Sequence, residues 1–72
     1  MKLQINGQEE NLDTDSLTVS ELLTLKEVKM PEMVSVELNG DILDREKFNS
    51  TVLKESDEVE FLYFMGGGVY AI

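Results

Sequence analysis

The sequence lacks cysteine and histidine altogether and is poor in basic residues. The absence of cysteine excludes disulfides and a thiol nucleophile, and the absence of histidine removes zinc-type clusters and the usual neutral-pH base. Six basic residues stand against fifteen acidic ones, which gives a net charge of −9. Such a surface repels nucleic acid and anionic membranes and favours a partner with a basic docking surface. A protein that is itself an enzyme is therefore the least favoured class.

Long hydrophobic runs are also missing. No apolar stretch approaches the roughly 20 residues of a membrane span, and no N-terminal segment has the pattern of a secretion signal. The 72 residues suffice for one domain, whose small core predicts modest stability. We therefore expect a soluble, cytoplasmic protein that is monomeric when free.

Apolar residues alternate with polar ones in segments that predict strands. In residues 1–5 the apolar positions are 1, 3 and 5, and in residues 34–38 they are 34, 36 and 38. Residues 59–64 predict the last strand. The Asn-Gly pairs at 6–7 and 39–40 predict tight primed turns after the first two strands.

One helix is predicted between the first two of these strands. Thr18 and Glu21 have the spacing of a capping box, and apolar residues follow with helical periodicity. The helix is expected to run from Val19 to about Lys29, because Pro31 disfavours helical backbone in the residue before it.

The remaining elements have weaker signals. A second strand returns around Leu12, and short strands are predicted at residues 42–43 and 51–53. Residues 44–48 predict a single helical turn that places Phe48 in the core.

The element order is ββαββ with a short helical insertion, which predicts an α+β fold of the β-grasp (ubiquitin-like) class. In this plan a mixed sheet of four to five strands wraps over one main helix, and the first and last strands lie parallel at its centre. We expect this domain to span residues 1–65 and to be followed by a flexible C-terminal tail, residues 66–72.

The tail begins with three glycines and ends with four apolar residues. Glycine lacks a Cβ atom, so this segment fits a channel too narrow for other residues. If Val59 and Phe61 face the helix, then Leu62 and Phe64 are exposed beside the tail and form a docking patch, with Met65 at the base of the tail. The competing interpretation is that a loop or the folded-back tail covers Leu62 or Phe64.

Several motifs, in this order, resemble ThiS-type sulfur carriers of the ThiS/MoaD group. They are residues 18–23 (TVSELL), 36–40 (VELNG), 44–46 (DRE), 56–59 (SDEV) and the glycine pair at 67–68. The similarity covers residues 1–68. The chain departs from the family pattern in its four additional residues, because ordinary members end at the second glycine.

The resemblance implies that Gly68 is the sulfur acceptor, with Gly67 as the alternative, and that Gly66 and Gly67 thread a channel in the activating enzyme. A ThiF/MoeB-like adenylyltransferase would adenylate the terminal glycine with ATP and magnesium, and sulfur transfer would then give a thiocarboxylate. No stably bound cofactor or metal is expected on the carrier itself.

The four extra residues imply a precursor. Gly68 is joined to Val69, so the resemblance implies cleavage between Gly68 and Val69. Zinc peptidases of the JAMM class are the candidate proteases. The sulfur would go to thiazole synthase for the thiazole ring of thiamin. Synthesis of cysteine, methionine or another sulfur metabolite stays open.

Two other classes also stay open at this point. A non-reactive β-grasp binding module could add residues 69–72 as a strand to a partner sheet. A protein modifier would instead be conjugated to lysines through the same activated glycine.

Overall fold

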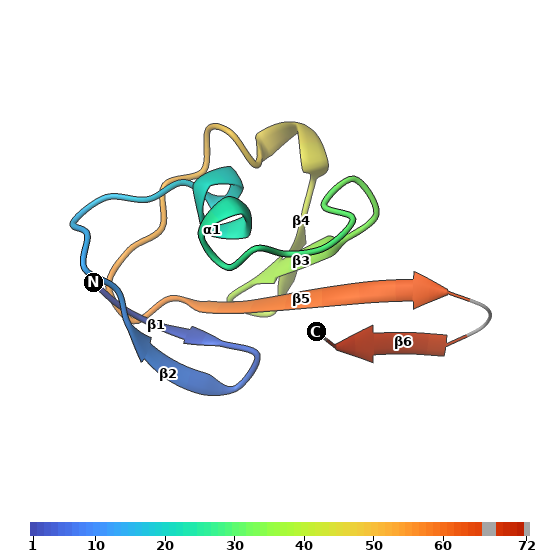
Figure 1. Cartoon of the computed structure of the whole chain (residues 1–72), viewed down its shortest axis with the longest axis horizontal. Coiled ribbons are helices and arrows are strands. Elements are labelled where there is room, and N and C mark those ends of the chain that lie inside the picture. The colour runs from blue at the N-terminus through green and yellow to red at the C-terminus, as the bar shows by residue number, and fades with distance from the viewer. Residues whose placement is uncertain (66–67, 72) are drawn as a thin grey trace.

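The computed structural model describes residues 1–65 and 68–71, and for Met65, Val69 and Ala71 it describes the backbone alone. The chain forms strands β1 and β2, helix α1, strands β3 and β4, a 3₁₀ turn η1, and strands β5 and β6 (Figure 1). The bounds are, in this order, Lys2–Ile5, Gln8–Asn11, Val19–Leu25, Ser35–Leu38, Asp41–Leu43, Arg45–Lys47, Glu58–Met65 and Gly68–Ala71.

One mixed sheet organises the molecule. Its hydrogen-bonded order is β2-β1-β5-β3-β4, with β6 paired to β5 outside this path. The β1–β5 pair is parallel, and the other pairs are antiparallel. Helix α1 covers one face of the sheet (Figure 1). The predicted β-grasp fold and the predicted parallel pairing of the first strand with the long strand β5 are both confirmed.

Both Asn-Gly pairs adopt the predicted turns. The φ angles are 51° at Asn6 and 82° at Gly7, and 52° at Asn39 and 89° at Gly40. Positive φ at both central residues is what a type I′ turn requires, and its twist matches that of the strands it joins. The two turns therefore fix the β1–β2 and β3–β4 hairpins.

Helix α1 begins as predicted but ends earlier. The Thr18 hydroxyl accepts from the Glu21 amide at 3.1 Å, and the Glu21 carboxylate accepts from the Thr18 amide at 2.8 Å. The helix ends at Leu25, so the predicted end near Lys29 is wrong. Glu27 takes a φ of 52°, and the Val28 amide donates back to the Leu23 carbonyl at 3.0 Å. This C-terminal motif closes the helix well before the proline.

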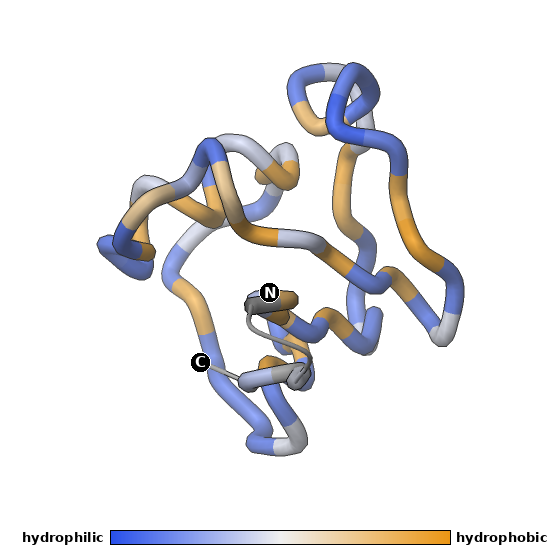
Figure 2. The backbone as a smooth tube through the Cα atoms, turned by 90° about the vertical axis from the view of Figure 1, so that its right-hand side faces the viewer, coloured by the Kyte–Doolittle hydropathy of each residue, from blue (hydrophilic) through white to orange (hydrophobic). Residues whose placement is uncertain are grey.

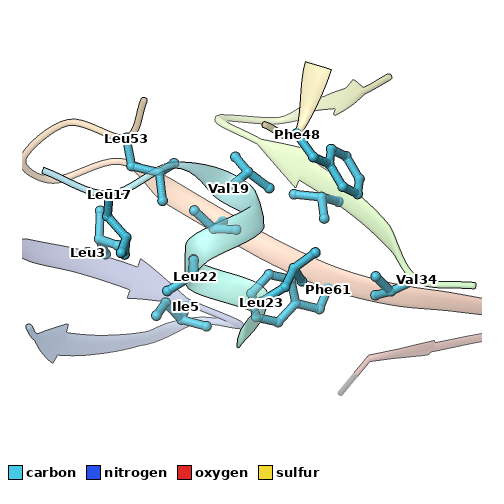
Figure 3. Close-up of a cluster of buried hydrophobic side chains, with 12 residues drawn as sticks. Leu3, Ile5, Leu17, Val19, Leu22, Leu23, Val34, Phe48, Leu53 and Phe61 are labelled. Atoms are coloured by element: carbon cyan, nitrogen blue, oxygen red, sulfur yellow. The ribbon is translucent and has the colours of Figure 1, made fainter. Parts of the chain in front are cut away.

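The core lies between α1 and the sheet. Figure 3 shows side chains from β1, α1 and β5 converging there, and Figure 2 shows hydrophobic and hydrophilic segments alternating along the backbone. Phe48 is buried, as predicted. The core cluster consists of Leu3, Ile5, Leu17, Val19, Leu22, Leu23, Val34, Val36, Phe48, Leu53, Val59 and Phe61.

The strand predicted at residues 51–53 does not form. Only an isolated bridge joins Val52 to Thr18, while Leu53 is buried and its amide donates to the Leu17 carbonyl at 2.8 Å. The segment thus packs against the chain that enters α1, and has too few partners for a ladder.

Arg45 explains why the turn η1 holds its position. Its guanidinium donates to the carbonyl oxygens of Pro31 and Val34 and lies 5.3 Å from the centre of the Phe48 ring. Charge-assisted hydrogen bonds of this kind are stronger than neutral ones. The arginine of the 44–46 motif therefore ties the loop before β3 to the turn that inserts Phe48.

Candidate functional site

The candidate site is built on β5, which is longer than every other strand. One edge of β5 pairs with β3, from Val59 to Leu62. The opposite edge pairs with β1 only at residues 58–59, because β1 ends at Ile5. The Asn6 side-chain oxygen then accepts from the Phe61 amide at 2.9 Å. The last four residues of β5 consequently extend beyond β1 on this edge.

Strand β6 pairs with these last four residues of β5. It runs antiparallel to β5, with Met65 opposite Gly68, Phe64 opposite Val69 and Leu62 opposite Ala71. Figure 1 shows it returning along β5. The structure differs here from the expected flexible tail, because residues 68–71 form a strand on the chain's own sheet. Gly66, Gly67 and Ile72 lie outside the described residues.

Gly68, the predicted acceptor, contacts a residue of the four-residue extension. A Cβ atom placed on Gly68 would lie 3.2 Å from the Tyr70 hydroxyl oxygen and 3.3 Å from the ring carbon that bears it. The ring of Tyr70 therefore rests against the space that a side chain at position 68 would need. Since Gly68 is followed by Val69, its carbonyl belongs to a peptide bond and is not a free carboxylate.

The predicted docking patch is only partly exposed. Val59 and Phe61 face the core as predicted, and Phe64 is 55% exposed. Leu62 is only 8% exposed, so its predicted exposure is wrong. Leu62 has a paired strand on each side, with Ser35 on β3 and Ala71 on β6.

Phe64 differs from Leu62 because it lies beyond the last residue of the β3 ladder and has a neighbour only on β6. The side chain of Met65, the third residue of the predicted patch, lies outside the described residues. The competing interpretation gains support at Leu62, which is buried and lies beside the returning strand β6.

Tyr63 joins this part of β5 to the loop after α1, although no sequence pattern marks it. Its ring packs against the core, and its hydroxyl donates to the Lys29 carbonyl in the loop after α1. Tyr63 lies directly opposite Tyr70. The alternation of apolar and polar residues could not reveal this, because a hydroxyl-to-carbonyl bond across 34 positions leaves no local pattern.

Strand β6 did have a sequence signal. Two glycines separate the apolar residues 61–65 from residues 68–71, which is the spacing of a hairpin with a two-residue loop. The three consecutive glycines favour a flexible tail instead, and this competing signal conceals the hairpin.

One further concavity, of about 460 Å³, lies between the β1–β2 hairpin and the end of α1. Asn6 and Phe61 contribute to its wall, and Lys26 binds Glu10 at 2.6 Å beside it. This ion pair joins the end of α1 to β2. In the part of the chain that the structure describes, no group of acidic residues is arranged to hold a metal ion. Nor does any helix among those residues have the length and apolarity to cross a bilayer.

Known proteins are similar to this chain in both sequence and fold. Residues 3–68 match the ThiS family. The chain is 32% identical to the sulfur carrier protein ThiS of Bacillus subtilis, over 92% of this chain and 98% of that protein. The crystal structure of the thiamine biosynthesis protein ThiS from Geobacter metallireducens superimposes with a TM-score of 0.88 at 52% identity, covering 94% of this chain and 100% of that one.

A longer protein contains a similar segment. The thiazole synthase of Magnetococcus marinus is 34% identical to this chain over 94% of the chain's residues. The match spans only 20% of the length of that synthase.

Proposed function

The chain belongs to the ThiS family, and on that premise we propose that it is a sulfur carrier protein that serves the synthesis of the thiamin thiazole ring. The observation that carries the proposal is the family match, which covers residues 3–68 and stops at the last glycine. The resemblance seen in the sequence to ThiS-type sulfur carriers is thereby confirmed. Membership of this family makes the chain a carrier on which enzymes act, and not a catalyst.

The proposed chemistry takes place at the C-terminal carboxylate of Gly68. A carboxylate resists nucleophiles, because it is an anion and its oxygen is a poor leaving group. An adenylyltransferase of the ThiF/MoeB type would let this carboxylate attack the α-phosphate of ATP, which releases pyrophosphate. Hydrosulfide, as the sulfur donor, would then attack the acyl carbon and displace AMP, leaving a thiocarboxylate on Gly68. ATP and magnesium act in the enzyme, and we place the reaction in the cytoplasm.

The proposal requires that the Gly68–Val69 peptide bond is hydrolysed first. A zinc peptidase of the JAMM class would do this by adding water across the bond. The support is that the family match stops at Gly68, while the four following residues continue the chain. Gly66 and Gly67 would then precede the free carboxylate as the segment that enters the narrow channel.

Thiazole synthase is the proposed sulfur acceptor. In the synthase of Magnetococcus marinus, a segment similar to this chain belongs to the same polypeptide. Such a fusion keeps a sulfur donor beside its acceptor at high effective concentration. A capped carrier for cysteine or methionine synthesis is the alternative, and the enzymes encoded beside this chain would discriminate between the two.

A non-reactive module that adds residues 69–72 to a partner sheet is less well supported. Residues 68–71 already pair with the chain's own β5. The tail would have to leave this strand pair before it could bind elsewhere.

The test is a truncation series that ends at Gly66, Gly67 or Gly68, compared with the full chain. Each protein is incubated with the adenylyltransferase of the same organism, ATP, magnesium and a sulfur donor, and intact mass is measured. We expect the mass change of replacing one oxygen by sulfur only in the chain ending at Gly68. Charging of the full chain, or of none of the four proteins, would contradict the proposal.

A further inference from the structure

We propose that β6 is an autoinhibitory strand: it covers the surface of β5 that the activating enzyme binds, and its removal exposes that surface at the same moment as it frees Gly68. This inference rests on the proposed function. It adds that the four extra residues block binding of the activating enzyme as well as adenylation of Gly68.

The first support is the way the edge of β5 is filled. The carbonyls of Asp57 and Val59 accept from the amides of Gln4 and Asn6, and the Phe61 amide donates to the Asn6 side chain. Peptide groups of odd-numbered residues in β5 therefore face this edge. Tyr63 and Met65 continue the series, and β6 is the strand that lies opposite them. Without β6, these two residues would present unpaired peptide groups.

The second support is the burial of Leu62. This side chain is 8% exposed although it does not belong to the core cluster around α1. Its neighbours across the two ladders are Ser35 and Ala71. Without β6, Ser35 would be the only one of these two neighbours left beside Leu62. The side chain of Leu62 would then be exposed next to Phe64, which lies on the same face of β5. A contiguous apolar patch would result, of the kind that marks a protein interface.

The third support is the position of Gly68. Because it pairs with Met65, its Cα lies about 5.5 Å from the Cα of that residue, as in a hydrogen-bonded antiparallel pair. A fully extended chain would carry the same atom about 10 Å away, at roughly 3.3 Å per residue over three residues. The Tyr70 ring also rests against Gly68. The hairpin therefore holds the acceptor back from an enzyme's channel.

The strand pair is short, so the inhibition is expected to be reversible. A four-residue antiparallel strand at a sheet edge has marginal stability of its own. If the enzyme binds only the form in which β6 has left β5, the apparent dissociation constant equals the intrinsic constant divided by the fraction of molecules in that open form. We expect about a tenfold weakening of binding, corresponding to about 1.4 kcal/mol.

Two proline variants separate strand pairing from the rest of the tail. The odd-numbered peptide groups of β5 face β6, so the Tyr70 amide faces Tyr63, and the Val69 amide faces away from β5. Tyr70→Pro therefore removes a ladder hydrogen bond, whereas Val69→Pro leaves the ladder donors in place. Amide hydrogen exchange at Tyr63 is expected to accelerate in Tyr70→Pro and not in Val69→Pro. Equal exchange in the two variants would overturn the inference.

The decisive measurement is equilibrium binding to the organism's adenylyltransferase without ATP. We compare the full chain, residues 1–68, Tyr70→Pro and Val69→Pro. The inference predicts about tenfold tighter binding of residues 1–68 and of Tyr70→Pro, with Val69→Pro within about twofold of the full chain. Equal binding of the full chain and residues 1–68, or of the two proline variants, would overturn it.

Charging of residues 1–68 separates this inference from the proposed function. If residues 1–68 are charged but all four proteins bind equally, the autoinhibitory strand is wrong and the sulfur carrier stands. If binding depends on β6 but residues 1–68 are never charged, the proposed function is wrong. If none of the four proteins binds, both are wrong.

Discussion

Strands β1 and β6 pair with the same edge of β5, yet their side chains are placed very differently. On β1, Leu3 and Ile5 are 0% and 4% exposed and belong to the core cluster. On β6, Tyr70 is 54% exposed and Gly68 has no side chain. Both strands pair with β5 through their backbones, so the burial of apolar side chains is what distinguishes β1 from β6, the strand that we propose is removed. The hydrophobic term is the larger contribution to folding.

The largest effect on stability is expected from truncating a buried side chain of β1. Leu3→Ala removes a fully buried side chain, and we expect a loss of about 2–5 kcal/mol in the free energy of unfolding. Tyr70→Ala is the matched control on β6, and a change below about 1 kcal/mol is expected because the ring is exposed. Urea denaturation followed by circular dichroism measures both. Similar losses in the two variants would contradict the comparison.

The second largest effect is expected at Asn6, which bonds to β5 between the part paired with β1 and the part paired with β6. Asn6→Gly keeps the positive φ of the turn but removes the oxygen that accepts from the Phe61 amide, and we expect a loss of about 1 kcal/mol. Asn6→Ala is expected to cost roughly 1–2 kcal/mol more, because alanine disfavours this φ. The same urea titrations rank the two variants. Equal stability of Asn6→Gly and the unaltered chain would show that the bond to Phe61 contributes nothing.

Removing β6 is expected to affect stability less than breaking β1. The chain ending at Gly68 loses most of one edge strand but no member of the core cluster. We expect a loss of about 1.4 kcal/mol, because a tenfold preference for the paired form stabilises the full chain by that amount. Thermal and urea unfolding of residues 1–68 and the full chain provide the measurement. A loss as large as that of Leu3→Ala would mean that β6 is part of the folding core and not a removable strand.

The smallest difference between the full chain and residues 1–68 is expected in how salt changes their rate of association with the enzyme. With a net charge of −9, association with a basic enzyme surface is expected to slow several-fold between about 10 mM and 150 mM salt. Residues 69–72 carry no charged side chain, so the slope should be equal for the full chain and residues 1–68. Stopped-flow mixing gives the rate constants. Different slopes would show that the extension itself changes the electrostatics of encounter.

Local chemistry explains which parts of the fold were predictable. The Asn-Gly turns and the Thr18–Glu21 capping box need only a few neighbouring residues, so they could be identified in the sequence. The end of α1 could not, because Glu27 adopts a positive φ that is unusual for a residue with a side chain.

The shape of the site was only partly predictable. The glycines and the resemblance predict Gly68 as the acceptor, and that role stays a prediction. The burial of Leu62 depends on two strands that meet it from different parts of the chain, at Ser35 and Ala71. Alternation along β5 shows only which face Leu62 occupies; it does not show what lies beside that residue.

The overhang of β5 separates Gly68 from β1, because Gly68 lies opposite Met65 at the end of β5 whereas β1 pairs with β5 only at Glu58 and Val59 (Figure 1). The exposed Asn11 on β2 lies opposite Lys2, at the start of β1, and is thus remote from Gly68. Because the sequence has no cysteine, Asn11→Cys would create a unique thiol for a fluorophore. The fluorescence anisotropy of such a reporter would follow binding of the enzyme in real time and would leave the glycine segment unlabelled.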